Sequence, residues 1–168
     1  VALGQDLSTR GRRIEEQVEV LRALWTDELV TFEGEFHEIP DAGIRPRPVQ
    51  RPIPIWMGGM ADPVKRRVAR TADGWMPQFQ PGEAARDHLA DLDEYAEAAG
   101  RDPDDVGLHG RTTAAPGEPE EWVDRVEAWQ DLGADYLAVG TMDCGLEGEA
   151  HATHLEAVAD VLEGVGLL

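Results

Sequence analysis

Four alternations of an apolar strand-like segment with a helix-length amphipathic segment dominate the sequence after residue 52. The segments expected to be strands are residues 53–57, 73–76, 106–113 and 136–140. The segments expected to be helices are residues 62–72, 82–99, 119–132 and 147–163. Apolar strands that alternate with helices indicate a parallel sheet covered by helices. The chain is therefore predicted to be an α/β protein.

Four strand-helix units fit two architectures, a small open doubly wound sheet or half of an eight-unit barrel. A complete eight-unit barrel takes about 250 residues. The chain has 168 residues, which excludes a complete barrel and suits one domain over residues 1–168. The pattern of apolar residues alone leaves both architectures open.

A helix, a hairpin and a proline-rich loop are expected before the first of these units. Residues 9–25 have a helical apolar stripe, and Ser8 is available as the helix cap. Residues 29–33 and 35–39 are expected to form a hairpin that turns at Gly34. Residues 40–54 are rich in proline and are expected to form an ordered extended loop. In the first strand-helix unit, Asp62 is expected to cap the helix and Pro63 to follow it.

The charge balance limits the partners of the chain. It has 34 acidic and 15 basic residues, a net charge of −19, and Lys65 as its only lysine. Such a surface repels phosphate backbones and anionic lipid headgroups, so neither nucleic acid nor membrane is expected as the main partner. The acidic residues indicate either a salt-adapted, halophilic surface or a carboxylate-rich binding face. Their spread over every predicted helix favours salt adaptation.

The single cysteine, Cys144, excludes an internal disulfide and a zinc ribbon. His151 and His154 share a helical face near it, but their spacing matches no zinc pattern, so no metal site is expected. No apolar segment is long enough to span a membrane and no signal segment is evident, which makes the cytoplasm the expected location. The chain begins at Val1 without methionine, which is expected of a fragment, a processed chain or an alternative start.

Six segments, taken in order, closely resemble the luciferase-like monooxygenase family. They are residues 10–13 (RGRR), 21–26 (LRALWT), 30–36 (VTFEGEF), 45–52 (RPRPVQRP), 54–59 (PIWMGG) and 72–77 (ADGWMP). The resemblance is strongest over residues 4–77. It implies a TIM-type barrel of which this chain is the C-terminal half, preceded by one helix and a hairpin. It also implies an oxidoreductase or monooxygenase that uses coenzyme F420 or FMN.

In this family about half of the barrel precedes the helix at residues 9–25, and that half supplies early strands, much of the ring pocket and usually the dimer interface. The resemblance therefore implies a chain that pairs with a separate N-terminal half or with another copy of itself. Unpaired sheet edges and an open apolar face favour such pairing. The alternative function is a non-catalytic half barrel, either a remnant or a self-associating interaction module.

The candidate cofactor-binding residues begin with Gly58, Gly59, Met60 and Ala61, which lie between a predicted strand and a predicted helix. Glycines let backbone amides approach a phosphate, and a helix N-terminus attracts anions. A plain tight turn is the alternative from spacing alone, and Asp62 would oppose an anion. The resemblance implies that the strand-end glycines lie at the coenzyme phosphate.

Two further candidates lie where later strands end. Gln78, or Gln80 beside it, would contact polar groups of a ligand, whereas Trp75 is expected to fill the core. Arg111 would bind a phosphate or carboxylate, although a simple ion pair is at least as expected in so acidic a chain. His109 has no recognisable catalytic partner, so no catalytic residue is assigned.

Overall fold

The computed structural model describes residues 6–117 and 119–167, so Val1 and the first two residues of the family-like segment lie outside it. The elements begin with a short 3-10 turn at Leu7–Thr9 and a helix, α1, at Arg10–Thr26. The strands are β1 (Val30–Glu33), β2 (Glu38–Ala42), β3 (Trp56–Gly58), β4 (Gly74–Met76), β5 (Gly107–Thr113) and β6 (Tyr136–Gly140). The remaining helices are α2 (Asp62–Thr71), α3 (Glu83–Ala98), α4 (Pro119–Gln130) and α5 (Ala150–Gly164), and a 3-10 turn covers Pro103–Asp105.

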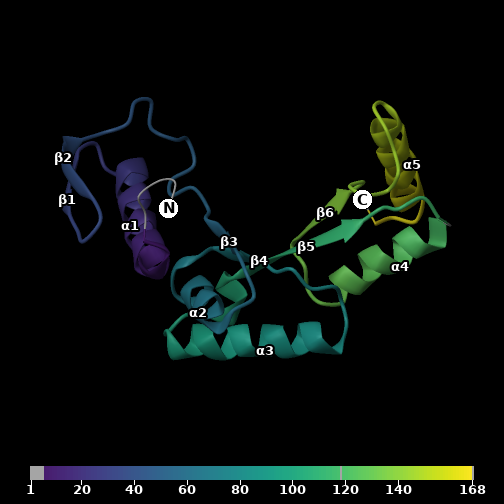
Figure 1. Ribbon diagram of the computed structural model, residues 1–168, viewed down its shortest axis with the longest axis horizontal. Helices are drawn as coiled ribbons and strands as arrows, with labels where there is room; N and C mark the ends of the chain where they lie inside the picture. Colours follow the sequence, from purple (N-terminus) through teal and green to yellow (C-terminus); the bar gives the residue numbers. More distant parts are fainter. Residues whose placement is uncertain (1–5, 118, 168) are drawn as a thin grey trace.

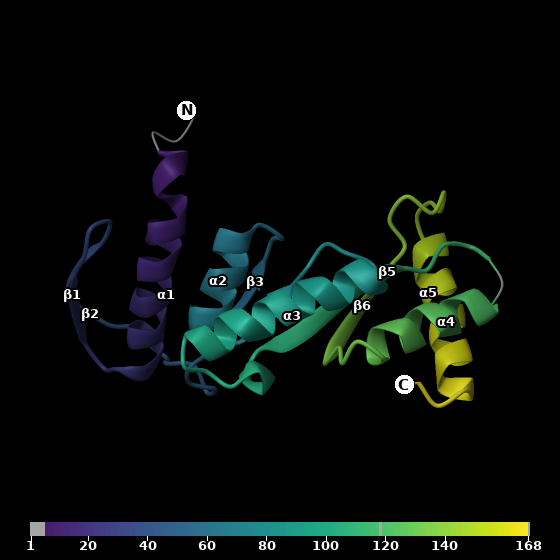
Figure 2. The same cartoon turned by 90° about the horizontal axis from the view of Figure 1, so that it is seen from below.

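Strands β3 to β6 form one parallel sheet whose spatial order equals their order in the chain. The helices that connect them pass on one side of the sheet (Figures 1 and 2). A doubly wound sheet would reverse direction and carry helices on both faces. Sequential parallel strands with helices on one face form an arc of a barrel, which decides between the two predicted architectures.

The core lies between this sheet and its helices. One cluster joins α2, α3 and α4 to the sheet through Val68, Leu92, Trp75 and Trp129. Trp75 has no exposed surface, which confirms that it belongs to the core. A second cluster packs α4 against α5 and β6.

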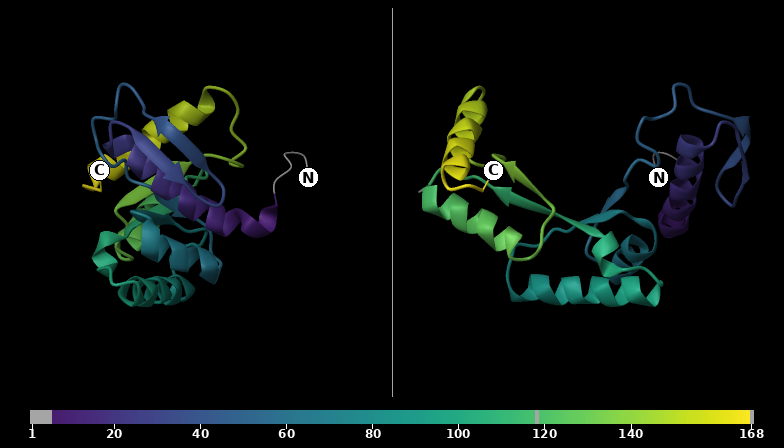
Figure 3. Two further views of the ribbon diagram at one scale, coloured as in Figure 1. Left: turned by 90° about the vertical axis from the view of Figure 1, so that its left-hand side faces the viewer. Right: turned by 180° about the vertical axis from the view of Figure 1, so that it is seen from behind.

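No helix of the described residues covers the opposite face of the sheet, which faces the inside of the arc (Figure 3, right). The indole of Trp56 lies on this face where β4 and β5 begin. Ideal Cβ atoms at Gly74 and Gly107 would come within 2.3 and 2.7 Å of the indole ring. The ring meets Tyr136 of β6 edge-on at a centroid distance of 5.4 Å. The two glycines are therefore what allows the indole to span the sheet.

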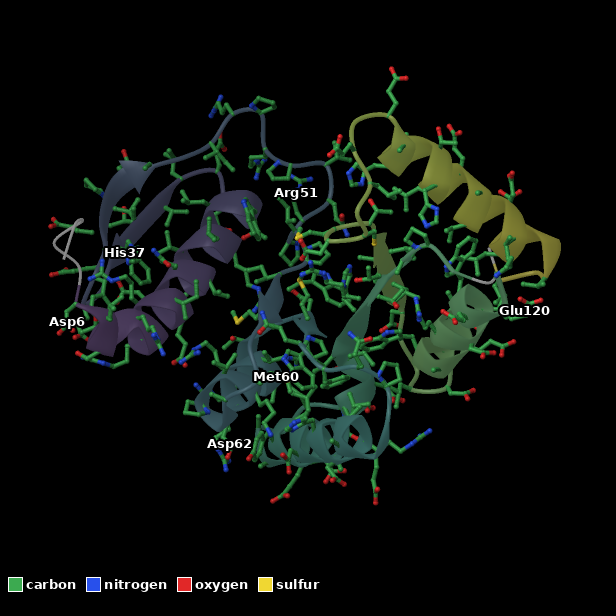
Figure 4. All side chains as sticks on the ribbon, turned by 45° about the vertical axis from the view of Figure 1, so that its right-hand side comes forward. Asp6, His37, Arg51, Met60, Asp62 and Glu120 are labelled. Carbon is green, nitrogen blue, oxygen red and sulfur yellow. The ribbon has the colours of Figure 1, made fainter. Side chains whose placement is uncertain are left out.

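The hairpin differs from its prediction, since β2 is Glu38–Ala42 rather than residues 35–39. Glu16 of α1 is the cause, because its carboxylate accepts the backbone N–H groups of Glu35, Phe36 and His37 and so holds residues 34–37 as a turn. His37 lies beside α1 in Figure 4, and its Nδ1 is 2.8 Å from the same carboxylate. Burial raises the pKa of Glu16, but these hydrogen bonds outweigh it and lower the pKa overall.

Three predicted helix and strand starts are wrong. Ser8 does not cap α1; its N–H donates to Asp6, and α1 begins without a side-chain cap. Ala61, not Asp62, is the residue before α2, because its carbonyl accepts the N–H groups three and four positions further on, at residues 64 and 65. β3 begins at Trp56 rather than at residue 53, because the prolines at positions 52 and 54 lack the N–H that a strand ladder uses.

Candidate functional site

Two hollows meet at Gly58, where β3 ends. The first, the helix groove, has a volume of about 860 Å³ and lies between α1 and the start of α2. It is lined by Leu7, Ser8, Arg10, Gly11, Ile14, Met57, Gly58, Ala61, Pro63, Val64 and Arg67. The second, the strand groove, has a volume of about 440 Å³ and follows the ends of β3, β4 and β5. It is lined by Gly58, Met76, Pro77, Gln78, Phe79, Gln80, His109, Arg111 and Thr113.

The turn after β3 requires glycine at Gly59. Its φ of +119° is rarely adopted by residues with a side chain, and an ideal Cβ would lie 3.2 Å from Cγ1 of Val64. Gly58 lines both grooves, and its ideal Cβ would lie 3.4 Å from the carbonyl oxygen of Met76. A tight, side-chain-free backbone therefore forms the rim between the two grooves.

Two of the predicted residues, Gly59 and Met60, line neither groove; they tie this turn to β4. The carbonyl of Gly59 accepts the indole N–H of Trp75 at 2.9 Å. The sulfur of Met60 accepts the N–H of Gln78 at 3.3 Å, and Figure 4 shows Met60 near the ends of the strands. Both hydrogen bonds hold the glycine turn at a fixed distance from β4.

The other predicted residues are divided between the grooves. Ala61 lines the helix groove, whereas Gln78 and Arg111 line the strand groove. The Nε2 of Gln80 donates to the carbonyl of Arg111 at 3.4 Å, which links the loop after β4 to β5. The structure thus places all six predicted residues in or beside the two grooves, near the carboxyl ends of three neighbouring strands. This region, with both grooves, is called the rim below.

The charge of this rim is opposite to that of the chain as a whole. Among the described residues, no aspartate or glutamate lines either groove, whereas Arg10, Arg67 and Arg111 do. The ion pairs that arginines form within the described part involve positions 12, 22, 45, 67, 70 and 125. Arg10 and Arg111 take no part in those pairs, so the ion pair expected as an alternative for Arg111 is not formed with any described residue.

Asp62, which the sequence suggested would repel an anion, shares the only lysine with a second carboxylate, so its charge is only partly offset. The Nζ of Lys65 lies 3.0 Å from a carboxylate oxygen of Asp62 and also bonds Asp91 of α3. Burial opposes the charge of Lys65, but the hydrogen bonds to these two carboxylates prevail and raise its pKa. Its hydrogen bond to Asp91 also lowers the pKa of that carboxyl. Figure 4 places Asp62 at the start of α2.

Sequence reasoning missed Arg10 and His109 as groove residues. Arg10 opens a segment on which the family resemblance rests, which was a usable signal. His109 was set aside for want of a partner in the sequence, but the strand groove brings it beside Arg111 and Gln78. The strand alternation of β5 predicts that His109 lies beside Arg111, but it does not predict that His109 lies near Gln78.

The cysteine and the two C-terminal histidines do not form a metal site in the described residues. His151 Nδ1 is 2.8 Å from the hydroxyl of Thr141, and His154 Nε2 is 2.8 Å from the carbonyl of Ala114. No group of three potential ligands is found in residues 6–117 and 119–167. Within the same residues, every helix is too short or too polar to cross a membrane.

Comparisons with known proteins agree on one family. A family model described as luciferase-like monooxygenase matches residues 1–110. An uncharacterised protein of Mycobacterium tuberculosis is 49% identical over 74 residues, which are 44% of this chain and 25% of that protein. The F420-dependent glucose-6-phosphate dehydrogenase of Intrasporangium calvum is 34% identical over 103 residues, which are 60% of this chain and 30% of that protein.

A solved structure extends the likeness over the whole fold. The EDTA monooxygenase of Chelativorans sp. BNC1 superimposes with a TM-score of 0.70 at 15% identity, covering 97% of this chain and 61% of that protein. At this identity the likeness is one of fold. The chain belongs to the luciferase-like monooxygenase family and has part of its α/β barrel fold. It spans about a quarter to three fifths of the three proteins compared.

Proposed function

We propose that the chain is the cofactor-phosphate-binding part of an oxidoreductase or monooxygenase that uses coenzyme F420 or FMN. The observation that carries the proposal is the rim at Gly58 and Gly59, which combines a side-chain-free turn with arginines and lacks described carboxylates in both grooves. The relative from Intrasporangium calvum is named as F420-dependent, which supports this class of cofactor.

The residues fit a phosphate. An anion before α2 gains from the helix dipole. Its backbone donors would come from the turn at residues 58–62, because Pro63 has no N–H and the N–H groups of Val64 and Lys65 donate to the carbonyl of Ala61.

Arg10 lines the helix groove, and a guanidinium suits phosphate by paired hydrogen bonds. Arg67 also lines it, but its Nε lies 3.0 Å from a carboxylate oxygen of Glu15, so its charge is already paired. Lys65 partly offsets Asp62, the acidic residue of the first turn, because it also pairs with Asp91.

In this proposal the bound cofactor supplies hydride or oxygen chemistry, and the chain's own residues hold and orient it. The helix groove takes the phosphate end, because Gly58 and Ala61 of the glycine turn line it together with Arg10. The strand groove takes the end nearer the reacting atoms, because it follows the carboxyl ends of the strands, where barrel proteins place their chemistry. No residue of this chain is proposed as the general acid or base.

Cofactor titration tests the proposal. Tryptophan fluorescence of the chain in molar salt is followed as F420 or FMN is added, and we expect saturable quenching by one of them. Gly59→Val adds a side chain where Val64 already lies and where the backbone has positive φ, so we expect at least tenfold weaker binding. Gly100→Ala is the matched control, since Gly100 also has positive φ but no atom within 4 Å of an ideal Cβ.

Circular dichroism shows whether each glycine variant is folded. Folded Gly59→Val with wild-type affinity would remove the phosphate assignment. Absence of quenching by either cofactor in the wild-type chain would refute the proposed function.

The second candidate is a non-catalytic half barrel that self-associates or pairs with an N-terminal half. It is favoured by the open inner face and by β3 and β6, each of which pairs on one side only within the described residues. Tyr136 on β6 is 61% exposed on this face. Light scattering alongside the titration separates the candidates: a stable particle of two or more chains that binds neither cofactor supports the second.

A further inference from the structure

Strand β5 presents a histidine and an arginine to the same hollow. Leu108 and Thr112 are buried toward the helices, whereas the alternate residues His109, Arg111 and Thr113 line the strand groove. Residues two apart on a strand lie roughly 7 Å apart and point to the same face. The imidazole of His109 and the guanidinium of Arg111 therefore both line the strand groove.

The neighbouring strand leaves room in front of this pair. In the parallel register, Arg111 lies beside Ala138 of β6 and Thr113 lies beside Gly140. Side chains this small do not fill the space before the guanidinium. The arginine therefore faces a hollow and not a packed core.

His109 is held by aromatic rings rather than by a polar partner. Its ring centroid lies 6.0 Å from that of Trp56 and 6.4 Å from that of Tyr136. The histidines that hydrogen-bond within the described residues are those at positions 37, 151 and 154. Within that part of the chain, the nitrogens of His109 are thus uncommitted and its ring orientation is supported from two sides.

The polar surroundings of the pair are neutral donors and acceptors. Gln78 and Gln80 come from the loop after β4 and line the same groove. No described carboxylate lines it, although 34 of the 168 residues are acidic. A site with an unpaired guanidinium, an imidazole and amides, kept free of carboxylates, has the chemistry of an oxyanion receptor.

We propose that Arg111 and His109 bind the anionic group, a carboxylate or a phosphate, of the substrate. The inference rests on the proposed function and reassigns Arg111 from the cofactor to the substrate. Because the helix groove has Arg10, which forms no ion pair with a described residue, the cofactor phosphate does not need Arg111. The substrate class is therefore a small organic anion that lies over β5.

The test uses inorganic phosphate and acetate as separate probes on the full chain. Nuclear magnetic resonance signals of the arginine Nε–H groups and the histidine rings are followed, with Arg111→Gln and His109→Gln assigning the signals. We expect at least one probe to shift both signals saturably and Arg111→Gln to weaken that probe at this site at least tenfold. Arg86→Gln removes the same charge from exposed α3 outside both grooves and is the matched control.

The cofactor titration separates this inference from the proposed function. We expect Arg111→Gln to change cofactor affinity less than twofold, whereas Gly59→Val should weaken cofactor binding at least tenfold and leave binding of the probe at Arg111 unchanged. If phosphate binds more tightly than acetate, the anionic group of the substrate is a phosphate; if acetate binds more tightly, it is a carboxylate.

The inference would be overturned if neither probe shifted the Nε–H signal of Arg111. It would also be overturned if Arg111→Gln weakened cofactor binding as much as Gly59→Val does. A wild-type chain that binds probe but neither cofactor would refute only the proposed function.

Discussion

Replacement of Gly74 by alanine tests whether the indole of Trp56 really spans the inner face. The added Cβ would lie 2.3 Å from ring atoms Cε3 and Cζ3, about 1.1 Å inside the 3.4 Å at which ordinary contacts begin. The rigid ring must move by about that amount, and Tyr136 stands at its far edge. Overpacking of this kind costs about 1–3 kcal/mol. We therefore expect a loss of about 2 kcal/mol in the free energy of unfolding.

Urea denaturation followed by circular dichroism measures this loss. With a slope of about 2 kcal/mol per molar urea, the midpoint should fall by about 1 M. In a Trp56→Leu background the obstacle is absent, so Gly74→Ala should cost less than about 0.5 kcal/mol. Gly164→Ala in α5, with nothing within 4 Å of its ideal Cβ, should be neutral or stabilising by up to about 1 kcal/mol. An equal loss with and without Trp56 would refute the reasoning.

Three further predictions concern charge. The folded state lowers the pKa of Glu16, so the ionised carboxylate stabilises the fold above its ordinary pKa of 4.5, and this stability is lost as the pH falls through the folded pKa. Glu16→Gln should remove this pH dependence of stability. It should also speed amide hydrogen exchange of Phe36 and His37 at pH 7. Burial, followed by Glu97 and Asp104, raises the pKa of Asp93, so Asp93→Asn should raise the melting temperature at pH 7 but not at pH 3, and equal gains at both pH values would contradict this. If the surface is salt-adapted, the melting temperature should rise from low to molar KCl, and a flat profile would argue against salt adaptation.

The strand-helix alternation was predictable from sequence because apolar strands and amphipathic helices have different periods. The periodicity alone did not choose between a barrel arc and a doubly wound sheet, since buried parallel strands have the same composition in both; the family resemblance implied the barrel. That choice depends on which face α2, α3 and α4 cover, which is a property of packing between distant segments. The hairpin register shows the same limit, because the residue that holds its turn is Glu16, some twenty positions earlier.

The candidate site divides in the same way. A glycine pair directly after an apolar strand is a local signal, so Gly58 and Gly59 were predictable. The reach of His109 toward Gln78 depends on the parallel register of β4 and β5, which no local spacing reveals. Lys65 was noticed as the only lysine, but its pairing with Asp91 depends on how α2 meets α3.

The contrast between an acidic molecule and a rim lined by arginines has a kinetic consequence. At low ionic strength an approaching anion meets the field of the whole chain, with its net charge of −19, before it reaches Arg10 or Arg111. Salt shortens the range of that repulsion to about 8 Å at physiological strength and about 3 Å at 1 M. Anionic ligands should therefore be captured faster in concentrated salt, the reverse of ordinary electrostatic steering, and saline water becomes the condition under which this rim fills quickly.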